Sequence, residues 1–219
     1  MPLPKSLRSP VPQRLKDSPR ARAIALSLGL IPPRTMHTDA EACLLAQLAR
    51  GAGRVVEIGV YEGSSALVFC AAMARTAELH LIDPFTDETG SALLPGARAT
   101  PFATRRAVAR GCADGPQIRW HVARSQDVGA SWRDGPVDLV FVDGDHSERG
   151  CREDWAAWQR HVMPGGYVAF HDARHAAADG RGSVTVTLVV DDLFRSHTQP
   201  GWRISNELES LVVVTRDPR

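Results

Sequence analysis

The sequence predicts a doubly wound α/β fold with a mostly parallel sheet. Short apolar segments, of the length of buried strands, alternate along the chain with longer segments that have helical spacing. Such alternation is typical of βαβ units, whose right-handed crossovers place helices on both faces of the sheet. The composition, with 43% hydrophobic and 23% charged residues, is that of a globular protein, and 219 residues fit one domain with a short extension.

Seven strands and five helices follow from this pattern. The predicted strands are residues 54–58, 79–82, 118–122, 138–142, 167–170, 201–205 and 211–215. The predicted helices are residues 38–50, 64–77, 102–112, 147–162 and 184–194. The last helix contains a Val-Thr-Val-Thr run that favours a strand, but Ser183 in front of it can cap a helix. The last two strands form an antiparallel hairpin around residues 206–209, and Pro164-Gly165-Gly166 is predicted as a turn.

The first 35 residues are predicted to form a basic, proline-rich arm in front of a main domain of residues 36–219. Residues 1–22 carry six basic side chains and one acid, whereas the whole chain has a net charge of only +1. We expect a solvated, partly ordered tail. The alternative is an arm that packs on a neighbouring subunit or covers an anionic substrate.

Charge, hydropathy and cysteine content exclude several classes of protein. A net charge of +1 argues against nucleic acid as a partner. No apolar run approaches the roughly 20 residues of a membrane helix, and no signal peptide is recognisable, so we expect a cytoplasmic protein that does not bind membranes. The cysteines form no CxxC pair, which predicts four reduced, mostly buried thiols: Cys43, Cys70, Cys112 and Cys151.

The most informative turn follows the first predicted strand. The strand ends at Glu57, Gly59 and Gly63 follow, and a helix then begins with Ser64 and Ser65. Ligands of parallel sheets lie beyond the carboxyl ends of the strands, and a helix N-terminus favours an anionic group. Tyr61 interrupts the dinucleotide fingerprint Gly-x-Gly-x-x-Gly, and Glu57 suits a cationic ligand that carries an amino acid better than a pyrophosphate. Asp83, after the second strand, can bind both hydroxyls of a ribose.

Acids and histidines follow the fourth and fifth strands. Asp143, Asp145 and His146 come after one strand, and His171 and Asp172 after the next, so these side chains are expected to converge. Two carboxylates from neighbouring strand ends suit a hard divalent cation such as Mg²⁺ better than zinc.

Two neighbouring groups of residues are interpreted as structural. We interpret Asp145 as a helix cap, and Asp154 as part of a solvated face or a partner of Arg152. Trp155 and Trp158, with helical i, i+3 spacing, are predicted to be core residues.

On these motifs the chain resembles class I S-adenosylmethionine (SAM)-dependent methyltransferases with a Rossmann-like fold, over roughly residues 35–215. The resemblance rests on Glu57-x-Gly59-x-x-x-Gly63 and on Asp83. It implies that the glycine turn binds the methionine part of SAM, that Asp83 binds the ribose, and that Ser125 and Gln126 lie near the adenine. The residues implied to contact the cofactor are Glu57, Gly59, Tyr61, Gly63, Ser64, Ser65, Asp83, Ser125, Gln126 and Asp143.

The second half is similar to metal-dependent O-methyltransferases of sugar hydroxyls, including the macrolide-sugar enzymes. Those enzymes have Asp-Gly-x-His after the fourth strand, an acid pair after the fifth and a Pro-Gly-Gly turn between them, and this chain has the same pattern with Asp172 as one acid of the pair. The resemblance implies that Asp143 and Asp172 are metal ligands and that Asp143 and His146 are catalytic, with His146 as general base. His171 stands where those enzymes have another carboxylate, which makes it the third implied ligand. The chain is close in size to compact mycobacterial enzymes that methylate methylmannose oligosaccharides in polysaccharide biosynthesis.

Several alternatives stay open. A catechol or other phenol is the next acceptor class, and a hydroxylase-like member of the fold would perform no methyl transfer. A non-catalytic SAM-binding scaffold is disfavoured because neither Asp143 nor His146 is needed to hold SAM. The acceptor is expected to be a small molecule or an oligosaccharide. The loop of residues 86–101 and the side chains of Arg174, His175 and Arg181 are expected to line its binding site. We expect the enzyme to be a homo-oligomer.

Overall fold

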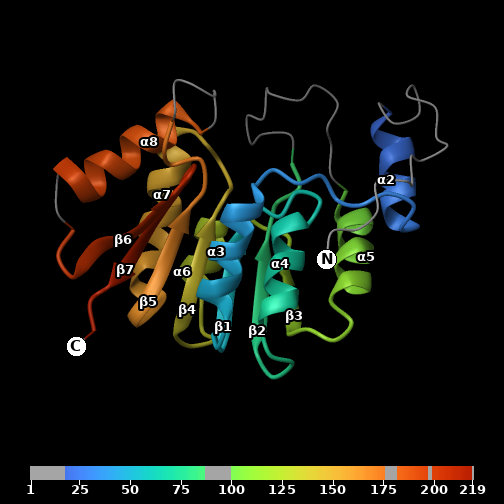
Figure 1. The fold of residues 1–219 in the computed structure, drawn as a ribbon, viewed down its shortest axis with the longest axis horizontal. Helices are drawn as coiled ribbons and strands as arrows, with labels where there is room; N and C mark the ends of the chain where they lie inside the picture. The colour runs from blue at the N-terminus through green and yellow to red at the C-terminus, as the bar shows by residue number, and fades with distance from the viewer. Residues whose placement is uncertain (1–17, 87–99, 176–181, 197–198, 219) are drawn as a thin grey trace.

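A computed structural model of the chain describes residues 18–86, 100–175, 182–196 and 199–218. Its centre is one seven-stranded sheet in the order β3-β2-β1-β4-β5-β7-β6 (Figure 1). Strands β1 to β5 run parallel, and β7 runs antiparallel to both β5 and β6. The predicted Rossmann-like fold with a C-terminal hairpin is therefore confirmed. The strands are β1 (Arg54–Ile58), β2 (Glu78–Ile82), β3 (Gln117–His121), β4 (Val137–Val142), β5 (Val162–Phe170), β6 (Trp202–Leu208) and β7 (Leu211–Arg216).

Helices cover both faces of this sheet. In Figure 1, α3, α4 and α5 lie on the near face, and α6 and α7 lie behind the strands. Among the described helices, none is long and apolar enough to cross a membrane. The α-helices are α2 (Pro19–Ser27), α3 (Asp39–Ala49), α4 (Ser64–Ala72), α5 (Pro101–Gly111), α6 (Ser125–Ser131), α7 (Glu148–Trp158) and α8 (Val184–Asp191), and shorter turns are η1 (Gln159–His161) and the π-helical η2 (Asp192–Ser196).

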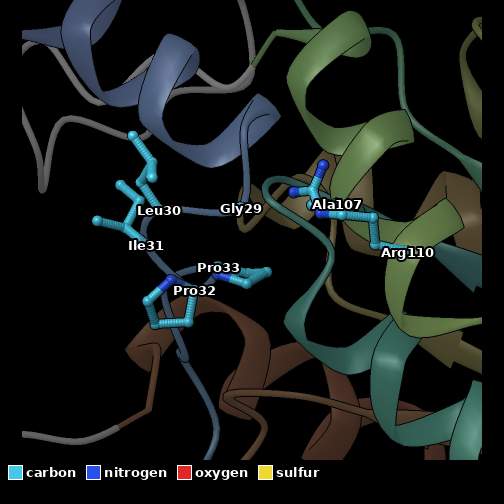
Figure 2. Close-up of a pocket in the computed structure, with 7 residues that line it drawn as sticks. All are labelled: Gly29, Leu30, Ile31, Pro32, Pro33, Ala107 and Arg110. Atoms are coloured by element: carbon cyan, nitrogen blue, oxygen red, sulfur yellow. The ribbon is translucent and has the colours of Figure 1, made fainter. Parts of the chain in front are cut away.

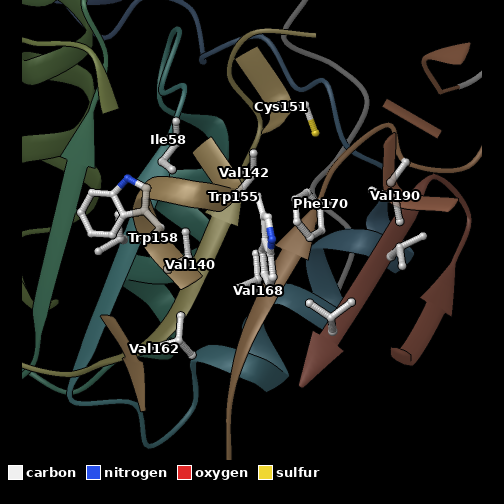
Figure 3. Packing of buried hydrophobic residues seen from close by; sticks show 14 of the residues in the cluster. Ile58, Val140, Val142, Cys151, Trp155, Trp158, Val162, Val168, Phe170 and Val190 are labelled. Carbon is white, nitrogen blue, oxygen red and sulfur yellow. The ribbon is translucent and has the colours of Figure 1, made fainter. Parts of the chain in front are cut away.

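Strand residues alternate between two hydrophobic clusters. Val55 and Leu139 face α3, α4 and α5, whereas Val140 and Phe170 face α6, α7 and α8. Figure 3 shows the second cluster, in which Trp155 and Trp158 of α7 lie against β4 and β5. Their predicted core position is confirmed, with 4% and 1% exposure. Strands buried on both faces explain why their sequences are continuous apolar runs.

Some predicted boundaries need correction. Helix α4 ends at Ala72, five residues earlier than predicted, and the turn of α6 at Ser125 was not predicted. The Pro164-Gly165-Gly166 segment was predicted to precede the fifth strand, but β5 begins at Val162 and includes it. The pairing with β4 jumps from Val162 to Tyr167 across this segment, so it forms an irregularity in the strand. The ambiguous segment at Val184 is a helix, as predicted.

The described part of the N-terminal arm packs on its own chain. Helix α2 contacts α5, and the guanidinium groups of Arg106 and Arg110 donate hydrogen bonds to carbonyls at the C-terminus of α2. The expectation of a solvated tail, made for the basic residues 1–22, is wrong for residues 19–22, because they belong to α2, which packs on α5 through Leu26. Residues 1–17 lie outside the described residues.

The cysteine prediction is wrong for two of the four residues. Cys70 of α4 forms a disulfide with Cys112 at the end of α5. These helices are neighbours on one face of the sheet, and a separation of 42 residues in sequence gives no sign of that proximity. Cys43 and Cys151 are free; Cys43 is exposed, whereas burial raises the pKa of the Cys151 thiol to about 12.

We predict that a buried histidine makes the fold sensitive to acid. Burial, helped by the neighbouring His121, lowers the pKa of His80 to about 4. Since an unfolded histidine takes up a proton near pH 6.5, the contribution of neutral His80 to stability is complete above pH 6.5 and is lost as the pH falls towards 4. Thermal unfolding of the wild type and His80→Gln should therefore differ most above pH 6.5. A difference in melting temperature that does not shrink below pH 6 would contradict this prediction.

Candidate functional site

The candidate site lies at the edge of the sheet where the central parallel strands end (Figure 1). The glycine turn follows β1, Asp83 follows β2, Asp143 follows β4, and His171 and Asp172 follow β5. Parallel pairing of β1 with β2 and β4, and of β4 with β5, brings these four ends to one edge, as the sequence predicts.

Two glycines shape the turn after β1. Gly59 has φ +85°, and a Cβ at this position would lie 2.1 Å from the carbonyl oxygen of Asp143. Gly63, with φ +91°, is the N-cap of α4 and offers no side chain to the first turn of the helix. Within the described residues, no side chain caps this helix, so its first amide groups suit a carboxylate such as that of methionine.

Asp83 is bound to the glycine turn. Its Oδ2 accepts hydrogen bonds from the amides of Val60 and Tyr61, both at 2.9 Å, and its Oδ1 accepts one from the amide of Phe85 at 2.6 Å. The side chain is only half-buried, and Oδ1, which accepts a single hydrogen bond, can accept a further one. The arrangement joins the ends of β1 and β2 and leaves one acceptor for a ribose hydroxyl.

Glu57 lies fully buried beneath the turn. It accepts a hydrogen bond from the hydroxyl of Ser65, and its Oε2 has no partner among the described residues. Burial raises the pKa of Glu57 well above its usual value, and the nearby charges of Asp143 and Asp83 raise it further. An unpartnered buried oxygen beside the turn fits a ligand that brings a positive charge.

The N-terminal arm reaches this turn through Glu62, a residue that the sequence reasoning missed. Arg22 of α2 donates two hydrogen bonds to the Glu62 carboxylate, and the amide of Arg34 donates another at 2.7 Å. The guanidinium of Arg34 also donates to the hydroxyl of Tyr61 at 2.8 Å. Glu62 is 3% exposed and forms an ion pair with Arg22. In the sequence, the signal for this pair is an acid within an otherwise apolar turn.

Three predicted residues meet at the ends of β4 and β5. One ligand atom each from Asp143, His146 and Asp172 lies within 4.8 Å of the others. His146 Nε2 is 3.1 Å from Asp172 Oδ2 and 3.9 Å from Asp143 Oδ1, and its side chain is 42% exposed. The contact with Asp172 is the main cause that raises the pKa of His146. Two carboxylates and an imidazole fit a divalent cation, with carboxylates the preferred ligands of Mg²⁺.

His171 occupies a different position from the one implied by the sequence. It is 4% exposed, and its Nδ1 lies 2.9 Å from Asp143 Oδ1. Its Nε2 faces the buried carboxylate of Glu41 at 3.7 Å, and Glu41 is held by the amide and hydroxyl of Ser210. Burial opposes a charge on His171, but Asp143 and Glu41 outweigh it and raise the pKa of His171 to about 11. The two ring nitrogens of His171 thus face Asp143 and Glu41, whereas the ligand atoms that lie within 4.8 Å of one another belong to Asp143, His146 and Asp172.

Asp154 is buried rather than solvated, which corrects its interpretation as a solvated side chain. It is 2% exposed and accepts hydrogen bonds from Ser125 and Gln126. Arg152, its expected partner, pairs instead with Glu148 and Asp192. Asp154 lies on the side of α7 that faces α6, and this contact was not foreseen because no helix was predicted at Ser125.

Other predicted residues play structural roles or lie at the margin. The prediction that Asp145 caps α7 is wrong, because the cap is Ser147, whose hydroxyl accepts a hydrogen bond from the amide of Gly150, and Asp145 accepts one from the amide of Ser147. Arg174 donates to the carbonyl of Glu209, and His175 contacts the carbonyl of Gly182. Arg181 and most of the predicted acceptor loop, residues 87–99, lie outside the described residues.

A shallow hollow lies apart from this edge. It is lined by the segment Gly29–Pro33 and by Ala107 and Arg110 of α5, as Figure 2 shows. The lining is apolar except for Arg110, whose guanidinium already donates to the end of α2. The hollow contains none of the residues predicted to bind a cofactor or metal, so we place the candidate site at the strand ends.

Comparisons with known proteins agree with this placement. A methyltransferase domain model matches residues 56–173, which include the glycine turn and the ends of β4 and β5. Three solved structures share the fold. Cofactor-bound Rv0187 from MTB has a TM-score of 0.62 at 18% identity and covers 91% of this chain and 90% of its own. The O-methyltransferase TomG from Streptomyces achromogenes, in complex with SAM, has a TM-score of 0.58 at 18% identity, with 97% and 93% covered.

The third structure is the O-methyltransferase NovP, with a TM-score of 0.66 at 14% identity and 91% and 89% of the two chains covered. The family model spans more than half of the chain and contains the turn and both acid-bearing strand ends. The chain therefore belongs to this methyltransferase domain family and is an enzyme that takes its methyl group from SAM.

Proposed function

We propose that the protein methylates a hydroxyl oxygen of a sugar or glycoside, with a divalent cation such as Mg²⁺ at Asp143 and Asp172 and with His146 as general base. One observation carries the proposal. The acids at the ends of β4 and β5 and the exposed imidazole of His146 converge next to the glycine turn. SAM can be bound without two acids and an imidazole at this place, whereas the activation of a hydroxyl group requires such side chains.

Different residues at the strand ends would each bind a different part of SAM. The free amides at the start of α4 would hold the methionine carboxylate, and Oδ1 of the half-buried Asp83 would accept from a ribose hydroxyl. Ser125 and Gln126, at the start of α6, would lie against the adenine. The contact between Gly59 and the backbone of Asp143 fixes the cofactor turn directly against the acid-bearing strand end.

Proton removal is the main chemical task of the protein in this reaction. SAM supplies a methyl carbon whose bond to sulfur breaks as the bond to the acceptor oxygen forms, leaving S-adenosylhomocysteine. A sugar hydroxyl has a high pKa, so its proton must leave as the oxygen attacks. His146, whose Nε2 lies beside Asp172 and Asp143, can take that proton on this nitrogen. A cation bound by the two acids would lower the pKa of a neighbouring oxygen and fix its position.

Oxygen as the acceptor atom is supported by the names of several neighbours in fold, since TomG and NovP are both O-methyltransferases. The sugar is supported by the resemblance of Asp143-Gly-x-His146 to the sugar enzymes. The same acids and imidazole could also bind the two neighbouring oxygens of a catechol. The class of acceptor is therefore the first property to determine.

The test is methyl transfer from labelled SAM to a panel of glycosides and catechols, with Mg²⁺ and with EDTA. We expect labelling of a glycoside that EDTA reduces by tenfold or more. Labelling that EDTA leaves unchanged would contradict the metal, and exclusive labelling of catechols would contradict the sugar. Tight SAM binding without any labelling across the panel would favour the hydroxylase-like alternative.

A further inference from the structure

Asp154 is a buried acid that the proposed mechanism does not use. It lies on α7, is 2% exposed, and directs one oxygen, Oδ1, at two residues of α6. The hydroxyl of Ser125 and the side-chain amide of Gln126, at 3.0 Å, both donate to this oxygen. The indole of Trp158 donates to the carbonyl of Ser125 at 3.2 Å, so α7 holds the start of α6 by three hydrogen bonds.

This contact decides the orientation of the Gln126 amide. A carboxyl oxygen that accepts hydrogen bonds requires the amide nitrogen of Gln126, and not its oxygen, to face Asp154. Burial raises the pKa of Asp154 to about 7, but Oδ1 accepts from Gln126 whether or not a proton resides on Oδ2. The carbonyl oxygen Oε1 of Gln126 therefore lies on the side of the amide opposite to this hydrogen bond, and the side chain is half-buried.

Asp154 also adjoins the metal-side loop. A Cβ at Gly144, directly after Asp143, would lie 3.4 Å from Asp154 Oδ2. Asp154 thus lies between the loop after β3 and the loop after β4, and we expect a change in the position of its side chain to affect the conformation of both loops. Since glycine has no Cβ, this distance shows only proximity, whereas the hydrogen bonds to α6 are directional and can confer selectivity.

We propose that Asp154 is a positioning residue for base recognition, which fixes the carbonyl oxygen of Gln126 to accept from the exocyclic amino group of the adenine in SAM. The inference rests on the proposed function, because it requires SAM at the strand ends. A purine with a 6-oxo group would bring an acceptor against this fixed acceptor and leave both unpaired. The protein should therefore discriminate between 6-amino and 6-oxo cofactors.

The experiment measures binding rather than activity. The affinities of S-adenosylhomocysteine and S-inosylhomocysteine are compared by calorimetry for the full-length wild type, Asp154→Asn and Asp154→Leu. Both replacements have nearly the size of aspartate, but only asparagine keeps an oxygen that can accept from Ser125 and Gln126. We expect the wild type and Asp154→Asn to prefer the adenosyl ligand by about tenfold or more, and Asp154→Leu to lose most of that preference.

The outcomes separate this inference from the proposed function. A wild type that binds neither ligand would contradict both. Normal S-adenosylhomocysteine binding with an unchanged preference in Asp154→Leu would overturn the inference alone. Should Asp154→Leu not fold, Gln126→Leu decides, because Gln126 is partly exposed: loss of the preference supports the inference, and its retention overturns it. A merely structural role of Asp154 would lower both affinities equally and leave their ratio unchanged.

Discussion

Replacing His146 with alanine is expected to lower kcat by about two to four orders of magnitude and to leave SAM affinity unchanged. The imidazole lies 3.1 Å from Asp172 and 3.9 Å from Asp143. The described contacts of His146 include no residue of the glycine turn, so the cofactor site loses nothing. Single-turnover kinetics with labelled SAM and calorimetry with S-adenosylhomocysteine measure the two quantities separately.

A conservative variant distinguishes a base from a merely polar neighbour. Glutamine at position 146 can donate and accept hydrogen bonds but cannot take up a proton near neutral pH. His146→Gln should therefore be as inactive as His146→Ala if the imidazole removes the proton. Activity of His146→Gln near that of the wild type would assign the residue an orienting role, and the base would have to be sought elsewhere at the edge.

The fold and the cofactor turn could be predicted because their signals are local. Buried parallel strands need short apolar runs, and a turn that enters a helix at positive φ needs glycine at positions 59 and 63. The strand order also brings Asp83, Asp143 and Asp172 to one edge without any knowledge of side-chain contacts. These features depend on the spacing of residues along the chain, which can be read from the sequence.

The contacts that were missed depend on packing between distant segments. Arg22 and Glu62 are 40 residues apart, and Cys70 and Cys112 are 42 apart, so no local pattern connects either pair. Asp154 looked solvated because Arg152 and Glu153 flank it in a charged stretch, yet its own side chain faces α6. Which side of a helix an acid faces is set by tertiary packing, and a single charged residue gives no periodicity to reveal it.

The arrangement at His171 shows how one substitution in a motif changes the expected site. The resemblance placed His171 among the ligands, where related enzymes have an acid. In the structure, a positive His171 between Asp143 and Glu41 lies behind the edge and offsets the charge of the acids. His146 lies with the two acids instead, so Asp143 contacts His171 and Asp172 contacts His146.

Replacing Gly59 with alanine is expected to unfold the protein or abolish SAM binding, the second large effect. An added Cβ would lie 2.1 Å from the Asp143 carbonyl oxygen and 2.8 Å from the Gly144 Cα, which are backbone atoms that cannot turn away. Either β1 and β4 separate at their ends or the glycine turn moves. Thermal unfolding and calorimetry with S-adenosylhomocysteine would measure the loss.

The chain supplies matched controls for the strain of positive φ. Gly51 and Gly165 have φ +82° and +80°, and an added Cβ would meet nothing within 4 Å at either position. Alanine there should cost only about 1–2 kcal/mol of unfolding free energy, the strain of a left-handed residue, and leave SAM binding intact. The additional loss in Gly59→Ala then measures the contact between β1 and β4 alone. Equal losses in all three variants would mean that the turn tolerates the displacement, and that the cofactor and metal sides of the edge are not held together by this contact.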